Sequence, residues 1–211
     1  MSITLYDYWR SSAAYRLRIT LNHLGLDYTA VPVDLTTGEH RGADHLARNP
    51  QGLVPVLDID GLRLTQSLAI LDYLECSRGL TLLPKEPGPR AAAMALAHAI
   101  AIDIHPVCNL SVARFAAELS GGRDTMPGEW MRRFIRPGLE AFETLLSGFD
   151  QAPYCCGNTP GLADICLIPQ LYNARRWEAD ISDLSRILAV ESACAEHPDF
   201  AAAHPDRCKP V

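Results

Sequence analysis

The chain has 211 residues, a formal net charge of −6 at pH 7 and 48% apolar residues, which suits one large domain or two small ones with packed cores. The acidic balance argues against a general nucleic-acid role, and no run of about 18 apolar residues predicts a membrane span. The segment Met1-Ser2-Ile3-Thr4 does not begin a basic and then apolar leader, so we expect no secretory signal and a cytoplasmic location.

The first third of the chain predicts strands and helices in the order β-α-β, α, β-β-α. Apolar or alternating runs predict strands at 3–8, 28–35, 56–59 and 62–65, and leucine spacing predicts helices over 14–24 and 68–79 with a shorter helical stretch around His45. Pro32 indicates an edge position for the second strand. Asp60-Gly61 predicts a two-residue hairpin turn. A parallel crossover followed by an antiparallel hairpin resembles the thioredoxin-like arrangement.

The remainder of the chain predicts helices only. A linker rich in Pro and Gly is expected at 83–89, and helices are expected over 91–119 with a kink at Pro106, then over 129–146, 161–172 and 182–194. The fold class predicted is therefore α+β with two domains. Residues 1–83 form a thioredoxin-like domain and residues 90–211 an all-α domain.

The cysteine pattern argues against a disulfide framework or a structural zinc site. The chain has seven cysteines, an odd number, and no two of them form a C-x-x-C pair. We expect reduced thiols that are mostly buried as small apolar residues, and no metal.

Ser11 and Ser12 lie between the first predicted strand and the first predicted helix. A helix N-terminus has unpaired N–H groups and a partial positive charge, which stabilise a thiolate. A serine at this place is read either as an N-cap or as a hydroxyl that donates to a bound thiolate. The two roles are compatible if Ser12 caps the helix and Ser11 faces the ligand.

Two later segments, like Ser11 and Ser12, each have one interpretation as an ordinary structural feature and one as part of a binding site. A cis Val54-Pro55 bond would leave the backbone of Val54 open to pair with a peptide, whereas a trans turn is the commoner form. Gln66-Ser67 precedes the last helix of the first domain, where Ser67 is either an N-cap or part of a carboxylate site. A thiolate site, a carboxylate site and an exposed backbone together match the chemical groups of glutathione.

Short motifs occur in order along most of the chain: Arg10-Ser11-Ser12-Ala13-Ala14-Tyr15-Arg16-Leu17-Arg18-Ile19, Asn49-Pro50, Val54-Pro55, Asp60-Gly61, Gln66-Ser67-Leu68-Ala69-Ile70, Asp103-Ile104-His105-Pro106, Asn109-Leu110-Ser111-Val112, Leu162-Ala163-Asp164 and Asn173-Ala174-Arg175-Arg176. Together they resemble the zeta class of glutathione transferases, which includes maleylacetoacetate and maleylpyruvate isomerases. The resemblance covers nearly the whole chain. Two positions differ from the family pattern: Ala13 replaces a cysteine, and Gly161 replaces the Ser or Thr of a capping box.

The resemblance implies a role for each candidate site residue. Ser11, next to Ser12, would hold the glutathione thiolate, Val54 the cysteinyl part, and Gln66 with Ser67 the γ-glutamyl end. His40, His105 and Asn109 would approach the glycyl carboxylate or the substrate, and Arg10 and Arg176 would bind substrate carboxylates. As alternatives, His40 is an ordinary loop residue, His105 a partly buried histidine at a kink, and Arg175 and Arg176 a solvated basic pair. Arg16 and Arg18 are expected to be structural or to face solvent.

The activity implied by the resemblance is cis–trans isomerisation of a conjugated dicarboxylate, with glutathione as a cofactor that is not consumed. Asn109-Leu110-Ser111 favours maleylacetoacetate, because maleylpyruvate enzymes tend to have arginine at the position of Ser111. A maleylpyruvate isomerase, a glutathione-binding protein without isomerase activity and a transferase acting on halogenated acids are the alternatives. The family also implies a homodimer.

Overall fold

The computed structural model describes residues 2–210, which divide into two compact units. The N-terminal unit comprises the chain up to Thr81 together with the segment from His197 onward, and the helical unit spans Leu82–Glu196. The predicted boundaries, 1–83 and 90–211, placed the last segment with the helices. The structure instead packs it on the first helix of the N-terminal unit, where the Nε of Arg18 donates to the carbonyl of Ala203 at 3.1 Å. None of the helices within residues 2–210 has the length and apolar character needed to cross a membrane.

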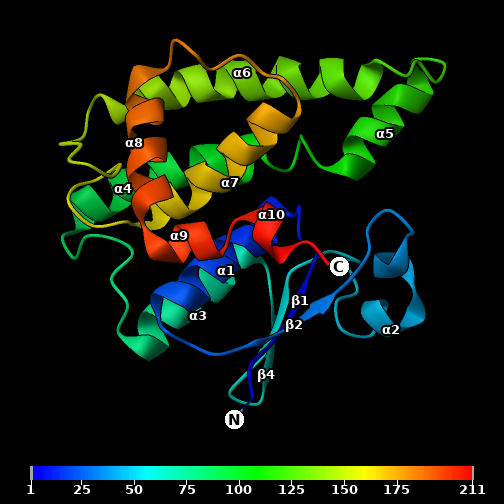
Figure 1. The fold of residues 1–211 in the computed structure, drawn as a ribbon, viewed down its shortest axis with the longest axis horizontal. Coiled ribbons are helices and arrows are strands. Elements are labelled where there is room, and N and C mark those ends of the chain that lie inside the picture. The colour runs from blue at the N-terminus through cyan, green and yellow to red at the C-terminus, as the bar shows by residue number, and fades with distance from the viewer. Residues whose placement is uncertain (1, 211) are drawn as a thin grey trace. The chain divides into compact units, whose positions relative to one another are not determined.

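A four-stranded sheet forms the centre of the N-terminal unit (Figure 1). Its strand order is β2-β1-β3-β4, with β1 parallel to β2 and antiparallel to β3; the strands are β1 (Thr4–Asp7), β2 (Thr29–Pro32), β3 (Val56–Ile59) and β4 (Leu62–Thr65). The edge position of β2 and the hairpin between β3 and β4 are both as predicted. Asp60 and Gly61 have φ of 54° and 78°, the left-handed values that a two-residue hairpin turn of type I′ requires.

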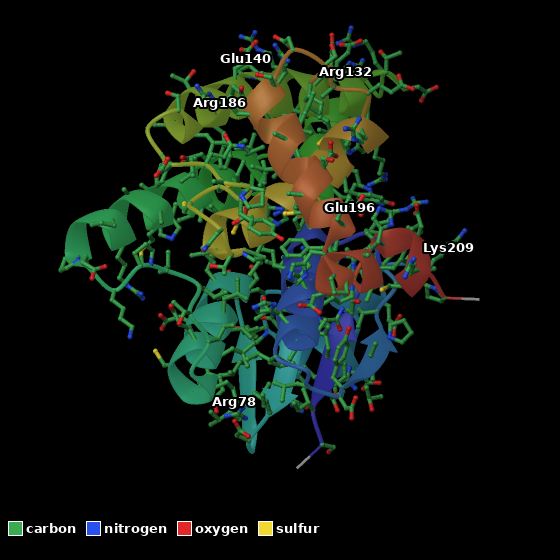
Figure 2. The ribbon with its side chains drawn as sticks, turned by 60° about the vertical axis from the view of Figure 1, so that its left-hand side comes forward. Arg78, Arg132, Glu140, Arg186, Glu196 and Lys209 are labelled. Carbon is green, nitrogen blue, oxygen red and sulfur yellow. The ribbon has the colours of Figure 1, made fainter. Side chains whose placement is uncertain are left out.

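Short and long helices surround this sheet. They are α1 (Ser12–His23), the 3₁₀ turn η1 (Glu39–Arg41), α2 (Ala43–Leu46), α3 (Ser67–Arg78), α9 (Pro198–Ala202) and α10 (Pro205–Cys208). Gly25 and Gly79 follow α1 and α3 with φ of 61° and 69°, so the predicted glycine stops are confirmed. Arg78 lies beside the β3–β4 turn (Figure 2), where its guanidinium and the hydroxyl of Tyr73 both donate to Asp60.

The helical unit differs from the sequence prediction in its first half. Its helices are α4 (Pro87–His98), the π-helical η2 (Ala99–Ile104), α5 (Leu110–Leu119), α6 (Met126–Leu146), α7 (Leu162–Arg176) and α8 (Ser185–Glu196). The predicted linker ends early because Pro87 occupies the first turn of α4, a position that suits proline. The predicted interruption at Pro106 is confirmed, but it is a break and not a kink within one helix over 91–119, since the chain leaves the helix around Pro106 and starts again at Leu110. Proline cannot continue the hydrogen-bond ladder there.

The start of α7 is held by a buried carboxylate. Asp164 is 0% exposed and accepts from the backbone N–H groups of Gly161 at 2.8 Å and Cys155 at 2.9 Å. Burial raises the pKa of this carboxyl above its ordinary value, and the two N–H donors act against the rise. The helix therefore keeps the carboxylate half of a capping box, while Gly161 has no hydroxyl to form the other half.

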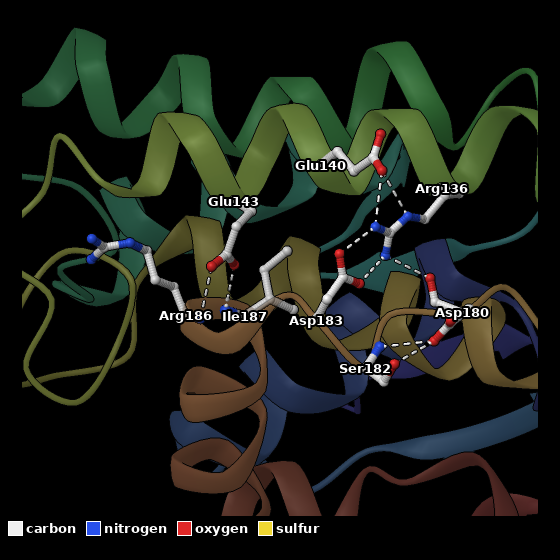
Figure 3. Close-up of polar contacts among 8 residues, drawn as sticks. All are labelled: Arg136, Glu140, Glu143, Asp180, Ser182, Asp183, Arg186 and Ile187. Atoms are coloured by element: carbon white, nitrogen blue, oxygen red, sulfur yellow. Dashed lines mark hydrogen bonds and ion pairs between the residues drawn. The ribbon is translucent and has the colours of Figure 1, made fainter.

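Acidic side chains also join α6 to the start of α8 (Figure 3). The two oxygens of Glu143 accept from the N–H groups of Arg186 and Ile187, each at 2.9 Å, and so cap α8. On α6, Arg136 holds both oxygens of Asp183 at 2.6 and 2.7 Å and also contacts Glu140 at 2.9 Å. A planar guanidinium fits this two-pronged contact with a carboxylate.

Candidate functional site

The register of the sheet brings three predicted site segments to one end of the N-terminal unit. Tyr6 pairs with Val56 across β1 and β3, and Val56 pairs with Thr65 across β3 and β4. These three paired residues form one row across the sheet. The loop to Ser11 begins just after Tyr6, the Val54-Pro55 segment ends just before Val56, and Gln66-Ser67 directly follows Thr65. The sequence motifs are 43 and 12 residues apart along the chain, yet the sheet places them at the same edge.

Ser11 is the N-cap of α1. Its φ and ψ are −69° and 119°, and its hydroxyl accepts from the N–H of Ala14 at 3.2 Å. This corrects the expectation that Ser12 is the cap, since Ser12 is already the first residue of the helix and is buried. A hydroxyl that accepts one bond still has its own hydrogen to donate. Ser11 can therefore cap the helix and serve a ligand together.

A buried arginine supports the loop that leads to Ser11. Arg18 donates to Asp7 at 2.6 Å and to the carbonyl of Trp9 at 2.9 Å, and the N–H of Ser11 donates to Tyr8 at 2.7 Å. Desolvation raises the pKa of Asp7, although the Arg18 charge opposes the rise. Arg18 is thus structural, as expected, and it orients the β1–α1 loop.

The segment before Val54 is anchored through one carbonyl. The Nε2 of His45 donates to the carbonyl of Leu53 at 3.0 Å, and the side-chain amide of Asn49 donates to the same oxygen at 2.8 Å. The Val54-Pro55 bond that follows is cis, which decides between the two forms left open by the sequence. The anchoring role of His45 was missed, because a histidine in a short helical stretch has no pattern that reveals its partner.

His40 belongs to the segment that packs against the loop that carries Val54. It lies in η1, and its carbonyl oxygen is 3.0 Å from the place where a Cβ on Gly52 would stand. Gly52 has a φ of 61°, so both conformation and space favour glycine there. The structure therefore brings His40 next to the loop that carries Val54.

Gln66 and Ser67 are held in an unusual backbone position at the start of α3. Gln66 has a φ of 67°, which is uncommon for a residue other than glycine and concentrates at ligand sites. Its side-chain amide donates to the side chain of Gln51 at 2.8 Å. The buried Arg16 of α1 donates to the hydroxyl of Ser67 at 3.1 Å, so a side chain of α1 fixes the first residue of α3.

Arg10 and the remaining candidates have different surroundings. Arg10 is half-buried, and its guanidinium lies 4.1 Å from the centre of the Trp9 ring, a cation–π distance. His105, Asn109 and Arg176 belong to the helical unit: His105 follows the π-helical turn, Asn109 is the N-cap of α5 and Arg176 ends α7. Arg176 is exposed, and its guanidinium lies 4.9 Å from the Trp177 ring centre.

The thiols of the chain are poor nucleophiles where their pKa is perturbed. Burial raises the pKa of Cys108 to about 11 and that of Cys156 to about 12, and it also raises the pKa of Cys155, Cys194 and Cys208. A thiol with a raised pKa is mostly protonated near pH 7 and reacts slowly. These five cysteines are therefore poorly suited to supply a sulfur nucleophile.

Comparisons with known proteins cover both units. Family models described as the N-terminal and the C-terminal domain of glutathione S-transferase match residues 1–76 and 128–205. A protein of Rhizobium meliloti (strain 1021) named maleylacetoacetate isomerase is 53% identical over 98% of this chain and 97% of its own length.

Solved structures agree with these matches. The holo structure of a maleylpyruvate isomerase, described as a bacterial glutathione S-transferase of the zeta class, has a TM-score of 0.94 at 37% identity and covers 98% of both chains. A maleylacetoacetate isomerase of Methylobacterium extorquens AM1, solved with malonate and glutathione bound, has a TM-score of 0.93 at 40% identity and also covers 98% of both chains.

Proposed function

Because this chain belongs to the zeta class of the glutathione S-transferase family, we propose that it is an isomerase that converts maleylacetoacetate to fumarylacetoacetate with glutathione as its cofactor. The observation that carries the proposal is the position of Ser11. Its hydroxyl lies at the N-terminus of α1, accepts the capping bond from Ala14 and still has a hydrogen to donate.

The N-terminal unit has the donors that glutathione needs. The start of α1 offers N–H groups and a partial positive charge for a sulfur anion, and the start of α3, with Gln66 and Ser67, offers the same for the γ-glutamyl carboxylate. Val54, after the anchored carbonyl of Leu53, is proposed to pair through its backbone with the cysteinyl part. We assign glutathione binding to this unit, with His40 near the glycyl end.

The protein contributes orientation and charge stabilisation to the reaction. When bound, glutathione supplies the sulfur nucleophile that acts reversibly at the cis double bond. Ser11 donates a hydrogen bond that keeps this sulfur ionised, although an isolated thiol has a pKa of about 8.5. Arg10 and Arg176 are proposed to bind the substrate carboxylates, since a guanidinium matches a carboxylate in geometry and charge. His105 and Asn109 are proposed as further polar contacts.

Maleylacetoacetate is favoured over maleylpyruvate on two grounds. The chain has Ser111 after Asn109-Leu110, where maleylpyruvate isomerases tend to have arginine. The relative with 53% identity is named a maleylacetoacetate isomerase, whereas a maleylpyruvate isomerase of Ralstonia sp. is 37% identical. Turnover of each cis substrate with glutathione decides between them. We expect faster turnover of maleylacetoacetate, and no turnover of either would refute the isomerase proposal.

Two substitutions at Ser11 separate its proposed hydrogen bond to the sulfur from its role as the N-cap of α1. Ser11→Ala removes both the hydroxyl and the cap, while Ser11→Gly removes the hydroxyl at a capping cost of only a few tenths of a kcal/mol. We expect both variants to lose kcat by roughly 10²-fold or more. Their rate should also rise toward higher pH, because the bound thiol becomes harder to ionise. A variant with wild-type kcat and an unchanged pH profile would remove Ser11 from the mechanism.

We also propose that the protein is a cytoplasmic homodimer. The family resemblance implies the dimer, and α5 has an exposed apolar face formed by Val112, Phe115 and Leu119, the last of them 74% exposed. These side chains are three and four residues apart and so share one side of the helix. Light scattering is expected to give twice the chain mass of 23.1 kDa. A monomeric mass at micromolar concentration would refute the dimer.

A further inference from the structure

The C-terminal segment of the N-terminal unit contains the same tripeptide twice. His197-Pro198-Asp199 opens α9, and His204-Pro205-Asp206 opens α10. In both, the histidine is the N-cap and its Nδ1 accepts from the N–H of the aspartate, at 3.4 Å in the first and 3.3 Å in the second. Local sequence thus produces the same turn in both places.

The first tripeptide meets a third polar side chain, from α1. His23, in the last turn of α1, has its Nδ1 2.8 Å from a carboxylate oxygen of Asp199, and the same oxygen is 3.5 Å from Nδ1 of His197. One potential ligand atom from each of the three residues lies within 4.8 Å of the others. Their side chains remain 20% to 30% exposed, so an ion from solution can reach them.

We propose that His23, His197 and Asp199 form a binding site for a transition-metal ion, with Zn²⁺ as its representative. Two imidazoles and one carboxylate suit zinc, nickel, copper or cobalt, whereas calcium and magnesium prefer oxygen ligands alone. Ligand atoms within 4.8 Å need only small side-chain rotations to reach zinc distances of about 2.0–2.2 Å. Three protein ligands leave a further coordination position for water.

The ion would join two parts of the N-terminal unit that are far apart in sequence. His23 belongs to α1, and the other two ligands belong to the segment that the structure packs against α1. The side chain of Asn22 already donates to the carbonyl of Asp199 at 3.1 Å. A metal held at this place would reinforce the attachment of the C-terminal segment to the helix that begins at Ser11.

Zinc titration of the full chain without an affinity tag tests the site. Isothermal calorimetry of the wild type is expected to show one Zn²⁺ per chain. His23→Gln keeps a group that can bond Asp199, and His197→Asn keeps a favoured N-cap, yet each is expected to weaken zinc binding by at least about tenfold. The matched control is His204→Asn, which makes the same change in the second tripeptide and is expected to leave the affinity within about twofold.

The absorption spectrum of bound Co²⁺ distinguishes binding at this site from binding to the cysteines. Co²⁺ bound to the wild type should show visible d–d absorption without a thiolate charge-transfer band, and excess chelator should reverse both this spectrum and a zinc-dependent rise in melting temperature. Equal zinc affinity in all four proteins, or a thiolate band, would overturn the proposal. If one of the two site variants does not fold, the other still locates the site against the His204→Asn control.

Discussion

Asp164→Ala is expected to destabilise the helical unit strongly. The carboxylate is fully buried and accepts from the N–H groups of Gly161 and Cys155 at 2.8 and 2.9 Å. Alanine leaves both donors without their acceptor, the N–H of Cys155 in a buried position and that of Gly161 in a part-buried one, at a cost of about 1–3 kcal/mol each. Burial raises the pKa of the carboxyl, so the charge itself is costly to bury, and the expected loss lies in the lower half of the summed range, at about 3 kcal/mol.

Urea unfolding followed by circular dichroism measures this loss. Asp164→Asn is expected to lose less than the alanine variant, because the amide oxygen can still accept one of the two bonds. The exposed Asp150→Ala is the control and should stay within about 0.5 kcal/mol of the wild type. A loss below about 1 kcal/mol in Asp164→Ala would show that the two N–H groups find other partners and that the carboxylate does not hold the start of α7.

Three further predictions concern other contacts. Gly138→Ala should lower stability by about 1–3 kcal/mol in the same assay, because side-chain atoms of Ile104 lie 2.5 Å from the place of a new Cβ; an unchanged midpoint would contradict this packing. Ser11→Ala should melt at a lower temperature than Ser11→Gly, since alanine loses a cap worth about 1 kcal/mol, and equal melting temperatures would argue against the capping bond. The Arg136 guanidinium lowers the pKa of Asp183 in the folded protein. The wild type should therefore have a larger free energy of unfolding than Asp183→Asn above the unfolded pKa of about 3.9, and this difference should vanish as pH falls through the lowered folded pKa. A difference in stability that persists at the lowest pH would refute the ion pair as its source.

Local signals predicted most of the sheet correctly. The strands 56–59 and 62–65 match β3 and β4 at both ends, because the turn between them is specified by Asp60-Gly61 alone. The stops at Gly25 and Gly79 are equally local. Pro106 correctly indicated where the helix predicted over 91–119 is interrupted, but a proline in a sequence does not show whether the helix bends or ends there. The helices α9 and α10 are four or five residues long, which is too short for a periodic pattern.

The order of strands and helices along the first domain and the identity of the family are visible in the linear chain, since turn residues and motif spacing act over a few positions. Contacts across the fold are not visible there. Arg16 reaches Ser67 over 51 residues and His23 reaches Asp199 over 176. Such pairs depend on how sheet register and helix packing bring distant segments together. A polar residue in the sequence therefore shows what it is able to bind, and the folded chain alone decides which partner it meets.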